Sequence, residues 1–112
     1  MLLIEDEPII AWEVESKLHQ WGFSNVIVKE SMTDSKELLL SDQCDIVISN
    51  LRLIDGWVDY DFAELLKRGK THLILLTGLS SKDLHKVDWS PIQPKFLFKP
   101  YTSFQLKQIL ET

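Results

Sequence analysis

The chain has 112 residues, a length that suits one domain with one hydrophobic core. Its net charge of −5 excludes a basic surface for nucleic acid, and a content of 45% hydrophobic and 26% charged residues is typical of globular proteins. No stretch is long and apolar enough for a membrane span, and the first residues do not resemble a signal peptide. Because the single cysteine, Cys44, cannot form an internal disulfide, we expect a cytoplasmic protein.

Short apolar runs alternate with helical patterns in the first half of the chain. Residues 2–4 predict a first strand, and apolar residues recur at helical spacing over residues 8–22, from a proline to a glycine. Residues 26–28 predict a second strand, because they are β-branched. A second helix is expected over residues 31–40, where a serine precedes an aspartate by three positions, and residues 46–49 predict the third strand.

The same alternation continues in the second half. Residues 58–69 have helical spacing, residues 73–76 predict the fourth strand, and residues 82–87 predict a further helix. Residues 96–98 predict the fifth strand, and a last helix is expected over residues 102–110, where Thr102 and Gln105 have the spacing of a helix cap. Five strands that each precede a helix predict an α/β fold, a parallel sheet with helices on both faces.

Polar residues follow four of the predicted strands, at the sheet edge where open α/β folds bind ligands. The first strand is followed by Glu5 and Asp6, the third by Asn50, the fourth by Thr77 and the fifth by Lys99. Adjacent carboxylates are ligands for Mg²⁺, and a lysine and a hydroxyl suit the oxygens of a phosphoryl group. The set lacks an attacking carboxylate, and an asparagine stands where that group would be expected.

Four segments carry a resemblance to a known family: "LLIEDEP", "DIVISNLRLIDG", "LILLTG" and "FLFKP". In this order and spacing, they make the chain similar to a response-regulator receiver domain of the CheY-like superfamily. The resemblance covers the whole chain, residues 1–112, as a single domain. It implies a doubly wound, flavodoxin-like sheet of five parallel strands in the order 2-1-3-4-5. It also implies a signalling domain of two-component systems and not an enzyme.

The resemblance assigns roles to the residues at the strand ends. It implies that Glu5 and Asp6 form the acidic pair for a metal, and that Asn50 holds the phosphoacceptor position. It implies further that Thr77 is the switch hydroxyl and that Lys99 is the lysine that binds the phosphoryl group.

Three further residues receive roles from the same resemblance. Arg52 would offer its backbone carbonyl to the metal, Phe96 falls on the aromatic switch position, and Pro100 would follow a cis peptide bond. The implied partners are proteins: a histidine kinase, a phosphotransfer protein or an effector domain, and a homodimer is compatible with the family. Neither nucleic acid nor a membrane is expected as a direct partner.

Asn50 departs from the family, whose members carry an aspartate there. A carboxamide cannot form a stable acyl phosphate, and the local charge changes from about −2 to about −1, which weakens Mg²⁺ binding. We expect the Asn50 amide to donate a hydrogen bond to Asp6 or to accept one from Lys99. The sequence therefore predicts a degenerate receiver that signals by protein binding without phosphorylation.

Two alternatives remain at this point. The chain is an ordinary phosphorylatable receiver in which the aspartate has been replaced, or it is a flavodoxin-type cofactor domain or a small α/β hydrolase on the same layout. The last reading is the weakest, because "EDEP" after the first strand would repel a flavin phosphate. The sequence also contains no G-x-S-x-G motif.

Overall fold

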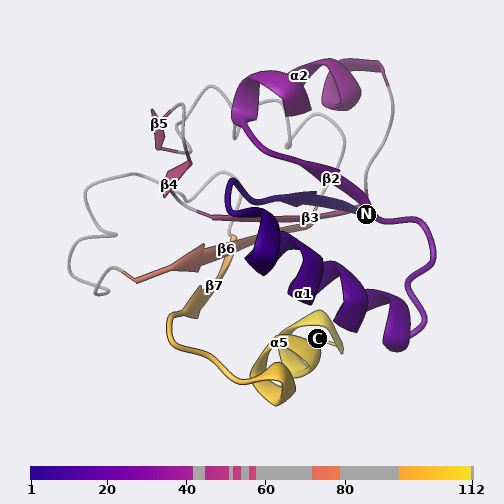
Figure 1. Ribbon diagram of the computed structural model, residues 1–112, viewed down its shortest axis with the longest axis vertical. Helices are drawn as coiled ribbons and strands as arrows, with labels where there is room; N and C mark the ends of the chain where they lie inside the picture. Colours follow the sequence, from indigo (N-terminus) through magenta and orange to yellow (C-terminus); the bar gives the residue numbers. More distant parts are fainter. Residues whose placement is uncertain (42–44, 51, 54–55, 58–71, 79–93, 112) are drawn as a thin grey trace.

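The computed structural model describes residues 1–41, 45–50, 52–53, 56–57, 72–78 and 94–111 (Figure 1). Within these residues, five parallel strands form one sheet in the order β2-β1-β3-β6-β7. The strands are β1 (Leu2–Ile4), β2 (Ile27–Lys29), β3 (Ile46–Asn50), β6 (His72–Thr77) and β7 (Lys95–Phe98). This is the order that the resemblance implied, and each predicted strand is found within two residues of its expected ends.

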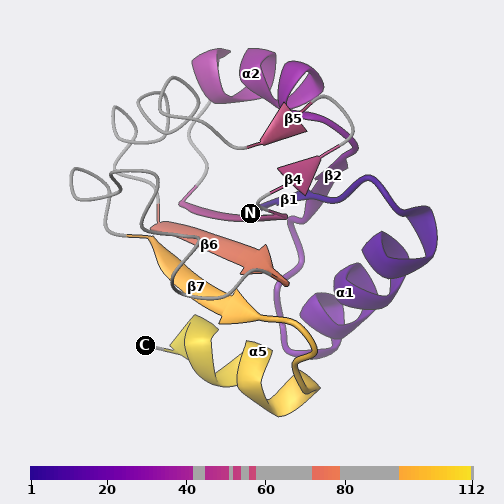
Figure 2. The same ribbon diagram turned by 90° about the vertical axis from the view of Figure 1, so that its left-hand side faces the viewer.

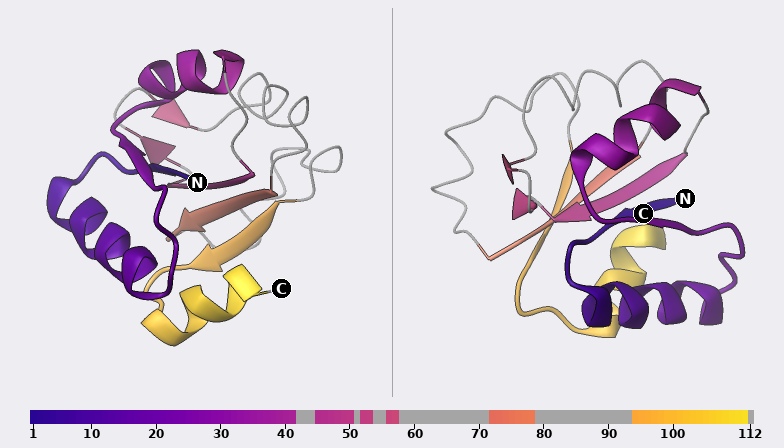
Figure 3. Two further views of the ribbon diagram at one scale, coloured as in Figure 1. Left: turned by 90° about the vertical axis from the view of Figure 1, so that its right-hand side faces the viewer. Right: turned by 45° about the horizontal axis from the view of Figure 1, so that its top comes forward.

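Helices lie on both faces of the sheet. Helices α1 (Pro8–Gln20) and α5 (Ser103–Glu111) cover one face, and α2 (Met32–Ser41) lies on the opposite side (Figure 3). The helices predicted over residues 58–69 and 82–87 lie outside the described residues. In the part of the chain that the structure describes, no helix is long and apolar enough to cross a membrane.

A second, two-stranded antiparallel sheet follows β3 and was not predicted. It consists of β4 (Arg52–Leu53) and β5 (Gly56–Trp57), with Arg52 paired to Trp57 and Leu53 to Gly56. Strands of two residues have no periodic hydrophobic pattern, so the sequence gives no signal for them.

The central strands are buried on both faces, which explains why their apolar residues do not alternate with polar ones. Leu2, Leu3 and Ile4 of β1 are all fully buried, although they point alternately to the two faces. The core between the sheet and helices α1 and α5 is formed by Leu3, Val14, Leu18, Ile48, Ile74, Leu76, Leu97 and Leu106.

Local signals in the sequence set the helix ends. The Ser31 hydroxyl accepts a hydrogen bond from the backbone of Asp34 at 3.1 Å, as predicted. At the end of α1, Gly22 has a positive φ of 100°, and the backbone N–H groups of Gly22 and Phe23 bond to the carbonyls of His19 and Leu18. Glycine suits this left-handed position because it has no Cβ, so the chain turns sharply toward β2.

Helix α5 begins with the reciprocal cap predicted from the sequence. The Thr102 hydroxyl accepts from the Gln105 N–H at 3.1 Å, and the Gln105 side chain accepts from the Thr102 N–H at 2.8 Å. We expect Thr102→Ala to lower the free energy of unfolding by about 1 kcal/mol, because the Gln105 N–H loses its partner. Urea unfolding measures this loss, and Gln108→Ala, at an exposed position of the same helix, serves as the control. Equal stability of Thr102→Ala and the unchanged chain would contradict the role of the cap.

Candidate functional site

The strand ends meet at one edge of the sheet because the strands are parallel and in register. Strands β6 and β7 run side by side in the same direction (Figure 2), and Thr77 is paired with Phe98. On the other side of β6, Asn50 is paired with Leu76. Ile4 is paired with Ser49, so Glu5, the next residue after β1, lies alongside Asn50.

Asn50 connects a buried acid to a lysine. Its Nδ2 donates a hydrogen bond to Oε2 of Glu5, and its Oδ1 accepts one from Nζ of Lys99 at 3.1 Å. The two partners fix the orientation of the amide, since an ammonium only donates and a carboxylate accepts. Asn50 is 6% exposed and Glu5 is 3% exposed, so the Asn50–Glu5 bond is shielded from water. The bridge Glu5–Asn50–Lys99 ties the ends of β1, β3 and β7 together.

From the sequence, we expected the Asn50 amide to donate to Asp6 or to accept from Lys99, and the structure contains the second of these bonds. Asn50 does accept a hydrogen bond from Lys99, but it donates to Glu5 and not to Asp6. The register of the sheet is the reason, because it places the first residue after β1 beside the end of β3. Asp6 is one position further along and partly exposed.

The surroundings of Glu5 disfavour its ionised form. Its Oε1 is buried and has no hydrogen-bond partner among the described residues, while its Oε2 also receives the Glu7 backbone N–H at 3.4 Å. Burial raises the pKa of Glu5, and the neighbouring Asp6 carboxyl raises it further, whereas the Glu7 N–H and the Lys99 ammonium lower it. The net direction is upward, so the site favours the protonated acid more than water does.

This shift predicts how Glu5 affects stability. The folded chain binds the Glu5 proton more tightly than the unfolded chain does, so the stabilising contribution is fully present below the ordinary pKa of 4.5 and is lost as pH rises through the raised pKa. We expect Glu5→Gln, which stays neutral, to gain stability relative to the unchanged chain as pH rises from about 4 to about 8. Urea unfolding of both proteins across this range measures the difference. A constant difference at every pH would contradict the upward shift.

The fifth strand brings Lys99 to the site. The backbone N–H of Lys99 donates to the Thr77 carbonyl at 2.7 Å, which fixes the end of β7 beside the end of β6. The peptide bond between Lys99 and Pro100 is cis, as the resemblance implied. Thr77 is 4% exposed, at the end of β6. Phe96 is half-buried, and its ring stacks on that of Phe98 with the centroids 6.5 Å apart.

The donor set at the strand ends fits a divalent cation poorly. Two acids, Glu5 and Asp6, are present, but Oε2 of Glu5 already accepts from the Asn50 amide. The amide oxygen that could bind a metal accepts from the Lys99 ammonium. Within the described ranges, no three His, Cys, Asp or Glu side chains come together as a metal-binding group. To bind the Asn50 oxygen, Mg²⁺ would have to displace the Lys99 ammonium, so the amide weakens this edge as a metal site.

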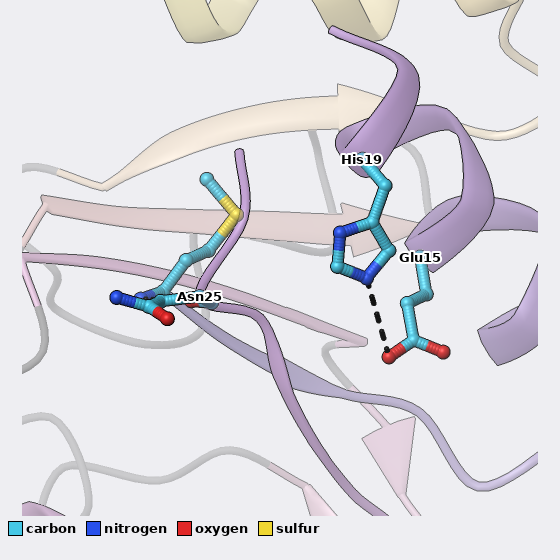
Figure 4. Close-up of polar contacts among 4 residues, drawn as sticks. Glu15, His19 and Asn25 are labelled. Carbon is cyan, nitrogen blue, oxygen red and sulfur yellow. Dashed lines mark hydrogen bonds and ion pairs between the residues drawn. The ribbon is translucent and has the colours of Figure 1, made fainter. Parts of the chain in front are cut away.

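The two histidines that the structure describes, His19 and His72, add no site. His19 lies on α1 with its Nε2 3.8 Å from the Glu15 carboxylate one turn earlier (Figure 4), which is an ordinary surface pair. His72 is exposed at the start of β6, and His85 lies outside the described residues. Arg52 belongs to β4, two residues after Asn50, and the role of its carbonyl toward a metal stays a prediction.

Tyr101 is a neighbour of the site that the sequence reasoning missed. Its ring is half-buried, and burial raises the pKa of its phenol, to which the negative charges of Glu5 and Glu13 add. The hydroxyl therefore stays protonated at neutral pH and can act as a donor. An aromatic residue directly after "FLFKP" was the available signal, but only the packing of α1 against the chain after β7 shows its place.

Comparison with known proteins settles the fold. The sequence matches no protein-family model and no curated protein. The structure, in contrast, is similar to the receiver domain of sensor histidine kinase PA1611 from Pseudomonas aeruginosa PAO1, with a TM-score of 0.81 and 19% identity over 98% of this chain and 92% of that one. That structure has a magnesium ion coordinated in its active-site cleft.

Two further structures agree. The non-phosphorylated HemR receiver domain from Leptospira biflexa has a TM-score of 0.81 and 22% identity, covering 98% of this chain and 89% of that one. A response regulator receiver protein from Sinorhizobium medicae WSM419 has a TM-score of 0.78 and 24% identity, covering 99% and 93%. The chain has the receiver-domain fold. The site at the strand ends therefore occupies the edge where this receiver fold, like other open α/β sheets, leaves room for a ligand.

Proposed function

We propose that this chain is a two-component receiver domain that acts by binding a protein partner without being phosphorylated. The observation that carries the proposal is the position of Asn50, at the end of the third strand between Glu5 and Lys99. In a receiver fold this is the place of the attacking carboxylate, and the residues expected around that carboxylate are present. Asn50 then is the phosphoacceptor equivalent, with Glu5 and Asp6 as the acidic pair.

The chemistry of the amide supports a non-phosphorylated role. The lone pair of its nitrogen is delocalised into the carbonyl, and its neutral oxygen, which accepts from Lys99, is a much weaker nucleophile than a carboxylate. Lys99 would otherwise bind a phosphoryl oxygen, and here it holds the amide. In a phosphorylated receiver, a metal ion and a phosphoryl group would balance the charges at this site. Here the Glu5–Asn50–Lys99 bridge balances them within the chain.

The proposed state is the inactive-like one. In a phosphorylated receiver, the phosphoryl oxygens would draw the hydroxyl of Thr77 toward position 50, and the Phe96 ring would change its rotamer in response. Asn50 carries no phosphoryl group, so neither change is expected. Any Mg²⁺ binding at Glu5, Asp6 and the Arg52 carbonyl is expected to be weak. A partner would recognise this one fixed arrangement instead of a phosphorylation-dependent switch.

The proposed partners are those that the resemblance to receiver domains implies. We infer a cytoplasmic, non-enzymatic role in which a histidine kinase, a phosphotransfer protein or an effector domain binds the chain, alone or as a homodimer. The intact surroundings of Asn50 also favour a second candidate, an ordinary receiver whose aspartate has been replaced. In both cases restoring the aspartate should restore the chemistry of the pocket.

Incubation with acetyl phosphate and Mg²⁺, followed by intact-protein mass spectrometry, tests the proposal. We expect no phosphoryl adduct on the unchanged chain, because a carboxamide forms no stable acyl phosphate. Asn50→Asp is expected to gain one adduct that is lost on treatment with hydroxylamine, as an acyl phosphate is. An adduct of the same kind on the unchanged chain would overturn the proposal. Absence of the adduct from Asn50→Asp as well would show that the pocket is not a receiver site.

A further inference from the structure

The outer side of helix α1 carries an exposed pair of large apolar residues. The helix packs on the sheet through Ala11, Val14 and Leu18 (Figure 3). Ile9 and Trp12 each stand two positions before one of these buried residues, which places them about 200° around the helix, toward solvent. Ile9 is 75% exposed and Trp12 is 67% exposed. Because they are three positions apart, the two side chains are neighbours on the helix surface and form one apolar patch, the α1 patch.

The α1 patch lies among negative charges. Residues 5–20 contain five carboxylates and one lysine: Glu5, Asp6, Glu7, Glu13, Glu15 and Lys17. Glu7 and Glu13 are exposed, and Glu13 directly follows Trp12. An exposed apolar patch with a polar rim is typical of a surface that binds another molecule.

The charge of this surface decides among the possible occupants. A second copy of the chain would bring its own carboxylates against Glu7 and Glu13, and an anionic membrane surface or a nucleic acid would be repelled in the same way. A partner with lysines and arginines is attracted instead, and the face of the Trp12 ring attracts a cation. Tryptophan is also among the residues that contribute most to protein interfaces. The surface therefore suits a basic segment of another protein.

The shape of the α1 patch suits a helix. The patch follows one turn of α1 and is narrow, and an amphipathic helix presents an equally narrow apolar stripe. We propose that the α1 patch docks a basic amphipathic helix of a protein partner, with the apolar residues of that helix on Ile9 and Trp12. The lysines or arginines of the partner lie toward Glu7 and Glu13.

This inference rests on the proposed function, since it names the surface and the charge of the partner that the receiver binds. The α1 patch and its two exposed carboxylates take no part in the bridge at Asn50. Docking on α1 therefore requires no phosphoryl group at position 50.

NMR titration of the ¹⁵N-labelled chain with two synthetic peptides tests the inference. The first peptide has about 14 residues, with leucines at helical spacing and lysines elsewhere, and the second carries glutamates in place of the lysines. We expect saturable shifts centred on the amides of residues 7–16 with the lysine peptide. The glutamate peptide should bind at least about tenfold more weakly, because its charges are repelled.

Variants of exposed side chains separate the α1 patch from general stickiness. Trp12→Ala is expected to weaken binding of the lysine peptide by at least about tenfold, as is usual for a tryptophan at the centre of an interface. Ile9→Ser should weaken it in the same direction. Glu13→Gln should weaken it by about twofold to fivefold, the usual worth of an exposed charge pair. Phe104→Ala is the matched control, because Phe104 is 70% exposed on α5, and it should leave the affinity unchanged.

Several results would overturn the inference: no saturable shift with the lysine peptide, shifts centred on another surface, or equal affinity for the two peptides. A loss of affinity in Phe104→Ala as large as that in Trp12→Ala would also overturn it. Self-association of the chain alone that is lost in Trp12→Ala would assign the α1 patch to a second copy instead. The acetyl phosphate experiment reports on position 50 alone, so a failure of docking is distinguishable from a failure of the proposed function.

Discussion

Asn50→Ala is expected to lower the free energy of unfolding by about 3 kcal/mol, a large loss for one side chain. The substitution removes the donor to Glu5 and the acceptor for Lys99 together. Glu5 is 3% exposed, so its carboxylate would stay buried beside Asp6 without the amide. Because an unpaired Glu5 can take up a proton, the loss should shrink as the pH falls.

Urea unfolding at neutral pH measures this effect, and Asn25→Ala is the matched control. Asn25 is exposed in the loop before β2, so its substitution should change the stability by less than about 0.5 kcal/mol. The double variant Glu5→Gln with Asn50→Ala should lose less than Asn50→Ala alone, since a neutral amide is easier to leave unpaired. A loss for Asn50→Ala no greater than that for Asn25→Ala would show that the bridge contributes nothing.

Asn50→Asp is expected to make the stability of the chain depend on Mg²⁺. The aspartate places a second carboxylate beside buried Glu5 and removes the amide donor, so the metal-free variant should be less stable than the unchanged chain. The change also restores a third acid to the site, which then suits a hard divalent cation. At about ten times its Kd, Mg²⁺ should add roughly 1.4 kcal/mol to the variant and much less to the unchanged chain.

Thermal unfolding with and without Mg²⁺ compares the two proteins, and Mg²⁺-free buffer with chelator provides the baseline. Asn50→Ala is the control, because it removes the amide without adding a carboxylate. A Mg²⁺ effect of equal size in the unchanged chain and in Asn50→Asp would mean that the amide does not weaken the metal site.

Much of the fold could be predicted because its signals are local. Apolar runs marked the five strands, the Thr102–Gln105 pair marked the start of α5, and Gly22 marked the end of α1. The convergence of Glu5, Asn50 and Lys99 followed from a general property of parallel sheets, whose strand ends meet at one edge.

The remaining features depend on how distant segments pack. The choice of Glu5 over Asp6 as the acceptor of the Asn50 amide follows from the register of β1 against β3, which no local pattern specifies. The open groove beside Tyr101 arises only where α1 meets the segment that leads into α5. The roles given to Arg52 and to the switch pair Thr77 and Phe96 stay predictions.

We propose that Asn50 holds this receiver fold in one state without metal or phosphoryl group. Tryptophan fluorescence is a suitable probe, because Trp12 lies in the first half of α1, the helix that begins two residues after Asp6. Mg²⁺ and then beryllium fluoride, which mimics a phosphoryl group on aspartate, are titrated into the unchanged chain and into Asn50→Asp. We expect no saturable change in the unchanged chain and a saturable change in Asn50→Asp. A response of the unchanged chain as strong as that of Asn50→Asp would contradict it.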